Sequence, residues 1–160
     1  MKKFVPLFLA ISLIVFSGCK VKDYTPELPS DFNLSAVVTS GDFSFDCEIC
    51  KNNDGVSVDV LTTSAQGLRM NCDGKNLTFV YDGCSYAVNT SGFEKTNSAI
   101  VVYEVFDYLN SAEQINAKKI EGGYKYEGKI SIGDFILIQN DDNSLKEITM
   151  KTSQYSIKFK

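Results

Sequence analysis

The stretch Phe43-Ser44-Phe45-Asp46-Cys47-Glu48-Ile49 alternates apolar and polar side chains at every position. Val56-Ser57-Val58-Asp59-Val60 repeats the alternation on the far side of Asp54-Gly55. A period of two is typical of a strand with one buried face and one wet face. An Asp-Gly pair suits the positive φ angles of a two-residue turn. These stretches therefore predict an antiparallel hairpin, and the remaining elements are worked out from this pattern.

The same alternation continues through most of the chain from Phe32 onward. Further strands are predicted around residues 68–71, 77–79, 124–132, 145–150 and 155–159, with Asp73-Gly74, Asp82-Gly83 and residues 140–143 as turns. The run 135–138 is wholly apolar, which predicts a central strand buried on both faces. The body is therefore expected to be mostly β.

Residues 99–112 break the period of two and predict one helix. Apolar side chains recur at helical spacing on one side of it, while Glu104, Asp107 and Asn110 occupy the opposite side. Asn97 or Ser98 is available as the N-cap. The expected fold class is α+β, mostly β: an antiparallel sheet with this amphipathic helix packed on its concave face.

Length and composition narrow the class of protein. The chain has 160 residues, which suits one domain with a real core. It contains no histidine, which excludes Ser-His and Cys-His triads and histidine metal ligands. The net charge of -4 gives no support to nucleic-acid binding. We expect a protein that is not an enzyme, with no metal, no cofactor and no nucleic-acid partner.

The N-terminus has the pattern of an export signal. Met1-Lys2-Lys3 is positively charged, and residues 4–16 carry no charge. As a helix these thirteen residues would span about 20 Å, too short for a hydrocarbon layer of roughly 30 Å. The pattern therefore favours a secretory signal over a permanent membrane span.

Phe16-Ser17-Gly18-Cys19 resembles the lipobox of bacterial lipoproteins. The resemblance implies that residues 1–18 are a lipoprotein signal peptide and that Cys19 is acylated as the mature N-terminus. Residues 19–31 would then be a tether, since Pro26 and Pro29 oppose regular structure. The protein would be exported and anchored to the lipid bilayer of a bacterial cell membrane, at its outer face. The pattern does not distinguish the inner membrane from the outer membrane. The alternative is an ordinary signal peptide with an incidental Cys19.

The layout of residues 32–160 resembles the LolA/LolB-like fold. The resemblance rests on the opening segment 32–36, the Asp82-Gly83 hairpin before the helix, the late segment Tyr126-Glu127-Gly128 and the closing segment 142–148. It implies a curved antiparallel half-barrel whose hollow holds helices and, in the carriers, lipid acyl chains.

These patterns are compatible with two functions. The first is binding or carrying a hydrophobic ligand such as a lipid or acyl chain, with a lining of Phe43, Phe45, Val58, Val60, Leu68, Met70, Leu77, Phe79, Val102 and Phe106. The second is a non-catalytic interaction or accessory module of the cell envelope with a filled core. Its sheet edge or exposed tyrosines would contact an unknown protein partner, the tyrosines being Tyr81, Tyr86, Tyr124 and Tyr126.

The body cysteines are predicted to be free thiols. A CxxC pair, Cys47-Glu48-Ile49-Cys50, lies on a predicted strand and not at the helix N-terminus that activates such pairs. With two-residue Asp-Gly turns, Cys47 would oppose Thr62 and Cys50 would oppose Asp59. By the same rule Cys72 would face Lys75 and Cys84 would face Tyr81, so no two cysteines meet. A zinc site or a redox pair is the less favoured interpretation.

Overall fold

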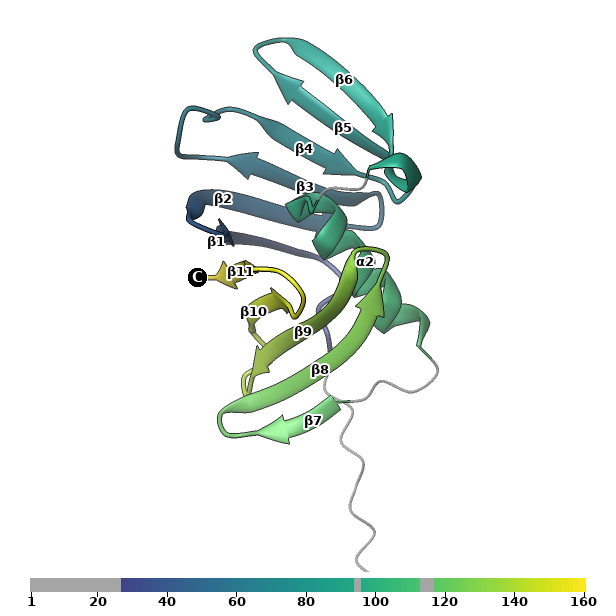
Figure 1. The fold of residues 1–160 in the computed structure, drawn as a ribbon. Helices are drawn as coiled ribbons and strands as arrows, with labels where there is room; N and C mark the ends of the chain where they lie inside the picture. Colours follow the sequence, from purple (N-terminus) through teal and green to yellow (C-terminus); the bar gives the residue numbers. More distant parts are fainter. Residues whose placement is uncertain (1–26, 94–95, 113–116) are drawn as a thin grey trace, which may run out of the picture.

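The residues that the structure describes form one open antiparallel sheet with one α-helix on its inner side (Figure 1). The structure, a computed structural model, describes residues 27–93, 96–112 and 117–160. Its strands are β1 (Phe32–Ser40), β2 (Phe43–Asn52), β3 (Gly55–Val60), β4 (Arg69–Cys72), β5 (Asn76–Tyr81), β6 (Cys84–Asn89), β7 (Ala117–Ile120), β8 (Gly123–Ile130), β9 (Gly133–Asn140), β10 (Leu145–Met150) and β11 (Tyr155–Phe159). The 3-10 turn η1 (Thr90–Gly92) and the helix α2 (Ser98–Ser111) lie between β6 and β7 in the chain.

The sheet order places the first and last strands side by side at its centre. The order is β6-β5-β4-β3-β2-β1-β11-β10-β9-β8-β7, and all pairs are antiparallel. The sheet curves, and α2 crosses its open side (Figure 1). The predicted curved antiparallel sheet with one helix on its concave face is therefore confirmed.

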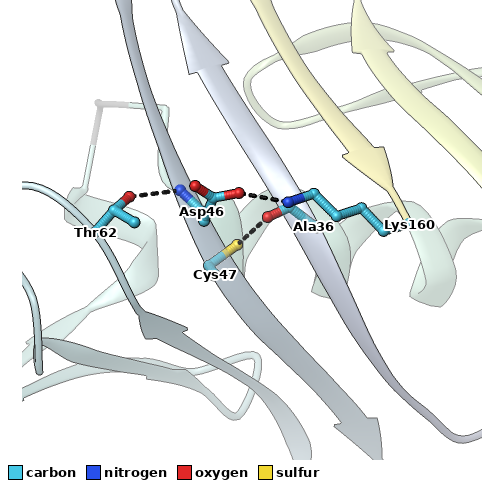
Figure 2. A network of polar contacts seen from close by, with 5 residues as sticks. All are labelled: Ala36, Asp46, Cys47, Thr62 and Lys160. Atoms are coloured by element: carbon cyan, nitrogen blue, oxygen red, sulfur yellow. Dashed lines mark hydrogen bonds and ion pairs between the residues drawn. The ribbon is translucent and has the colours of Figure 1, made fainter.

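Neighbouring residues on β2 show how the two faces differ. Cys47 is fully buried on the inner face, and its thiol donates to the Ala36 carbonyl over 3.7 Å. Asp46 points the other way, where its carboxylate accepts from Lys160 Nζ at 2.5 Å (Figure 2). The Asp46 N–H donates to Thr62 Oγ1 at 2.9 Å (Figure 2). The inner face of the sheet therefore contributes to the core, and the outer face is exposed to solvent and carries ion pairs.

Two of the three predicted Asp-Gly turns are displaced by one residue. Asn52 pairs with Gly55, so the first turn is Asn53-Asp54, and the Asn52 side chain accepts from the Asp54 N–H at 2.9 Å. Asp73 accepts from the N–H groups of Lys75 and Asn76, which makes Gly74-Lys75 the second turn. In both cases an Asn or Asp side chain preceding the turn decides which two residues form it.

The displaced turns change the partners predicted for three cysteines. Cys47 faces Val60 and not Thr62, and Cys50 faces Ser57 and not Asp59. Cys72 faces Leu77 and not Lys75. The third turn, Asp82-Gly83, is as predicted, because Tyr81 pairs with Cys84 and both turn residues have positive φ.

The apolar run 135–138 is buried on one face only, contrary to the prediction. Phe135 and Leu137 are fully buried in the core, but Ile136 and Ile138 are half-buried on the outer face. Across β8 and β10 these two isoleucines have polar neighbours, among them Glu127 beside Ile136. Long charged side chains cover apolar surface with their stems, which lets the strand keep isoleucine there.

The helix begins and ends within one residue of the prediction. The side chain of Asn97 accepts from the N–H groups of Ala99 and Ile100, so Asn97 is the N-cap and Ser98 is the first helical residue. None of the described helices is long and apolar enough to cross a membrane.

The segment before β1 lies against the body. The Glu27 carbonyl accepts from Gln139 Nε2 at 2.9 Å, and Leu28 packs on the core. Lys51 Nζ donates to the Ser30 carbonyl at 2.6 Å. The predicted signal peptide and Cys19 lie outside the described residues.

Candidate functional site

The space between the sheet and α2 is filled by side chains. Seven apolar residues of α2 are at most 2% exposed: Ala99, Ile100, Val101, Val102, Val105, Phe106 and Leu109. They pack against the inner faces of the strands, and Phe106 also meets the Phe32 ring at a centroid distance of 5.2 Å. The helix therefore occupies the place that a ligand would take in a hollow half-barrel.

The ten predicted lining residues divide into two groups. Val58, Val60, Met70, Leu77, Val102 and Phe106 are buried core residues. Phe45, Leu68 and Phe79 are partly buried at the core margin, and Phe43 is 53% exposed. None of the ten lines the hollows described below. Whether any of them touches a ligand stays a prediction.

Two glycines from opposite halves of the sheet leave room for side chains of α2 to pack closely. A Cβ on Gly74, in the β4–β5 turn, would lie 2.3 Å from Tyr103 Oη. A Cβ on Gly128, in β8, would lie 2.4 Å from Tyr108 Cε1 and 2.6 Å from Phe135 Cε1. The Tyr108 and Phe135 rings pack edge to face at 5.5 Å. Tyr103 and Tyr108 of α2 thus pack directly against the backbone of these two glycines, one on either side of the helix.

A carboxylate ties the outward side of α2 to the β8–β9 turn. The Glu104 carboxylate accepts from the Ser131 N–H at 2.9 Å and from the Ser131 hydroxyl at 2.7 Å. Glu104 is half-buried, and these donors satisfy its carboxylate. The contact spans the opening between α2 and the β8–β9 turn.

Two hollows share this contact and together form what we call the mouth. The larger, about 720 Å³, is lined by Gly74, Tyr103, Glu104, Asp107, Tyr108, Ser111, Ala112, Lys129, Ile130 and Ser131. The other, about 520 Å³, is lined by Thr90, Ser91, Phe93, Thr96, Glu104, Ser131 and Ile132. Both volumes lie in the range of small-molecule sites. Glu104 and Ser131 border both hollows, so their contact separates them.

The lining of the mouth is mixed in character. Two tyrosine rings, Ala112 and Ile130 provide apolar surface in the larger hollow, and Phe93 and Ile132 do so in the smaller one. Burial raises the pKa of the Tyr103 phenol, which stays a neutral hydrogen-bonding group at neutral pH. Lys129 and Asp107 add one charge of each sign at the edge. Such a surface fits a molecule with an apolar part and polar substituents.

A third and smaller hollow lies at the turn ends of β2–β5. It measures about 250 Å³ and is lined mainly by polar residues, among them Asn52, Asp54, Asn71 and Asp73. Within the described residues, no group of three or more His, Cys, Asp or Glu side chains is placed to hold a metal ion.

The four body cysteines are free thiols in different surroundings. Cys47 and Cys72 are buried, Cys50 is half-buried and Cys84 is exposed. Burial raises the pKa of Cys47 to about 12, with a smaller contribution from the Asp46 charge. Burial also raises the pKa of Cys72. Cys47 and Cys72 are therefore unreactive core residues.

The four tyrosines predicted to contact a partner do not share one surface. Tyr81 is 48% exposed and Tyr86 is 68% exposed, both on the β5–β6 hairpin. Tyr126 is fully buried and donates to Gln139 Oε1 at 2.6 Å, while Tyr124 is half-buried beneath Lys119. Only the first two are available as recognition residues.

Comparison with solved structures finds chains of similar fold. The chain is similar in structure to a LolA superfamily protein from Nitrosomonas europaea, with a TM-score of 0.43 and 13% sequence identity over 82% of this chain and 70% of that one. No protein-family model and no curated protein matches the sequence.

Sequence reasoning did not find the mouth. It placed Glu104 correctly on the polar side of the helix, but nothing in the pattern connects Glu104 with Ser131, 27 residues later. Tyr103 and the two glycines were also missed, because each looks ordinary until the strands bring them to the helix.

Proposed function

We propose that this protein is a non-catalytic binding protein of the bacterial envelope that takes a hydrophobic or amphipathic ligand, such as a fatty acid or lipid, at the mouth. The observation that carries the proposal is the pair of hollows beside Glu104 and Ser131. Aromatic and aliphatic side chains form part of their lining. The apolar part of the ligand would lie on Tyr103, Tyr108 and Ile130.

The mouth is favoured over the space beneath α2 on energetic grounds. The seven buried apolar residues of α2 include six large ones, all except Ala99. Exposing these six side chains to water would cost about 9–18 kcal/mol, at roughly 1.5–3 kcal/mol each. The whole free energy of unfolding of a domain is typically about 5–15 kcal/mol. A ligand beneath α2 would therefore have to replace nearly all the contacts of the helix, whereas a ligand at the mouth replaces none.

Binding of a fluorescent fatty acid tests this function. The full chain carries Cys19→Ser so that no acyl group of its own competes for the site. We expect saturable binding that Ser111→Trp weakens, because Ser111 lines the larger hollow. Asn110→Trp is the matched control, since Asn110 is the exposed preceding residue and does not line it. No saturable binding, or equal binding by both variants, would contradict the proposal.

Anchoring through Cys19 is part of the same proposal and has a separate test. The support for it is the segment Phe16-Ser17-Gly18-Cys19 after an uncharged run. Expression of the full chain in a bacterial host should yield a membrane-bound protein whose N-terminal peptide carries acyl chains. Cys19→Ala should release the protein from the membrane fraction, whereas Cys84→Ala should not.

A second candidate function, an interaction module with a filled core, is favoured by a different observation. Large apolar side chains are exposed where β2 begins and just where β3 and β5 end: Phe43, Leu61 and Tyr81. Crosslinking of the full chain in its envelope should then return a single protein partner.

A further inference from the structure

The two edges of the sheet differ in how they are protected. Strand β7 is one edge, and its four residues include Lys118 and Lys119. Strand β6 is the other edge, with the uncharged sequence Cys84-Ser85-Tyr86-Ala87-Val88-Asn89. Lysines and prolines on edge strands prevent pairing with other chains, and β6 has neither. Its first four residues are all exposed.

The pairing of β5 with β6 fixes which backbone groups face outward. The Thr90 N–H donates to the Lys75 carbonyl, so position 90 of the chain is hydrogen-bonded toward β5. In an antiparallel ladder the bonded positions alternate, which directs the backbone of residues 88, 86 and 84 toward β5 as well. The N–H and C=O groups of Ser85 and Ala87 therefore point away from the sheet.

We infer that β6 pairs with β6 of a second copy of this chain, antiparallel and centred on Tyr86. In that register Ser85 of each copy exchanges hydrogen bonds with Ala87 of the other. The two Tyr86 rings become cross-strand neighbours, which covers the most exposed large hydrophobic residue among those described.

Charge favours a second copy as the occupant. Residues 84–88 carry no charge, so this stretch of the two paired strands contains no charge repulsion. The nearest charged residue, Asp82, would lie opposite Thr90 of the partner copy. A charged partner strand would find no opposite charge on β6 to select it.

Cysteine crosslinking tests the register. In a Cys84→Ser background, Tyr86→Cys places two thiols at a non-hydrogen-bonded pair, where Cα atoms lie about 4.5 Å apart. A disulfide needs Cα atoms within about 7 Å, so the oxidised full chain should crosslink on the order of tenfold faster than Ser85→Cys in the same background. Ser85 is the matched control because it is equally exposed but faces Ala87 of the partner. Equal crosslinking of the two variants would overturn the register.

The mass of the purified full chain tests the pairing itself. The unaltered chain should be a dimer, and Ala87→Pro should be a monomer, because proline removes an outward N–H without touching the bonds to β5. Tyr86→Lys, at an exposed position, should also give a monomer by setting two ammonium groups opposite each other. A monomeric unaltered chain, or a dimer that persists in folded Tyr86→Lys, would contradict the inference. Fatty-acid binding by these variants should be unchanged, which separates this test from that of the mouth.

Discussion

The Glu104 carboxylate accepts two hydrogen bonds from Ser131, one from the backbone N–H at 2.9 Å and one from the hydroxyl at 2.7 Å. This contact joins the middle of α2 to the β8–β9 turn, between the two hollows of the mouth. The contact holds α2 against that turn.

Glu104→Ala should lower the free energy of unfolding by about 1–2 kcal/mol, because hydrogen bonds to a charged group contribute roughly 1.5–3 kcal/mol and this one is partly exposed. Urea unfolding measures the change. Asp107→Ala, which removes the same charge from an exposed position on α2, should have little effect. Equal losses in the two variants would show that the bridge does not stabilise the helix.

Gly128→Ala should destabilise the fold by about 1–3 kcal/mol, a range typical of overpacking in a core. The new methyl group would lie 2.4 Å from Tyr108 and 2.6 Å from Phe135. Gly92→Ala is the control, because nothing lies within 4 Å of its Cβ position. Thermal unfolding of both variants checks the prediction, and a Gly128→Ala protein as stable as the control would refute the close packing of Tyr108.

Much of the fold could be predicted from sequence, because alternation and helical spacing are local. The strands around Phe43–Asn52 and the helix near residues 99–112 were found in this way. Strand β7 was missed, since Ala117-Lys118-Lys119-Ile120 is an edge with no buried face to set a pattern.

The turn register and the filling of the half-barrel could not be predicted from local pattern. The register depends on which side chain caps the turn, as Asn52 and Asp73 do. The filling depends on how closely α2 approaches the sheet, and two glycines distant in sequence permit that approach. Both are consequences of tertiary contacts.

The four thiols should react at very different rates in the folded protein. Alkylation at neutral pH without reductant should modify Cys84 first and Cys50 more slowly. Cys47 should react only after unfolding, because burial excludes the reagent and raises the thiol pKa to about 12. Mass spectrometry after unfolding should find all four modified in the body. A disulfide among them, or rapid modification of Cys47, would contradict the packing of β2.

Acid should weaken the β4–β5 turn. The Asp73 carboxylate accepts from the Asn76 and Lys75 N–H groups, and these bonds lower its pKa below 3.8, the first contributing most. Because the pKa is depressed in the folded state, this stabilisation is present above pH 3.8 and is lost as the pH falls through the folded value. The stability difference between the unaltered chain and Asp73→Asn should therefore shrink in acid. A difference that stays constant down to pH 2 would mean that the charge is not involved.

The position of a bound ligand tests the central claim most directly. Methyl NMR spectra of the full chain carrying Cys19→Ser should be recorded while a fatty acid is added. We predict shifts at Ile130 and Ile132 in the mouth, with Val58 and Val102 unchanged and the amides of α2 still protected from exchange. Shifts at Val58 and Val102 together with loss of that protection would place the ligand beneath the helix and contradict the account, and an absence of any shift would do the same.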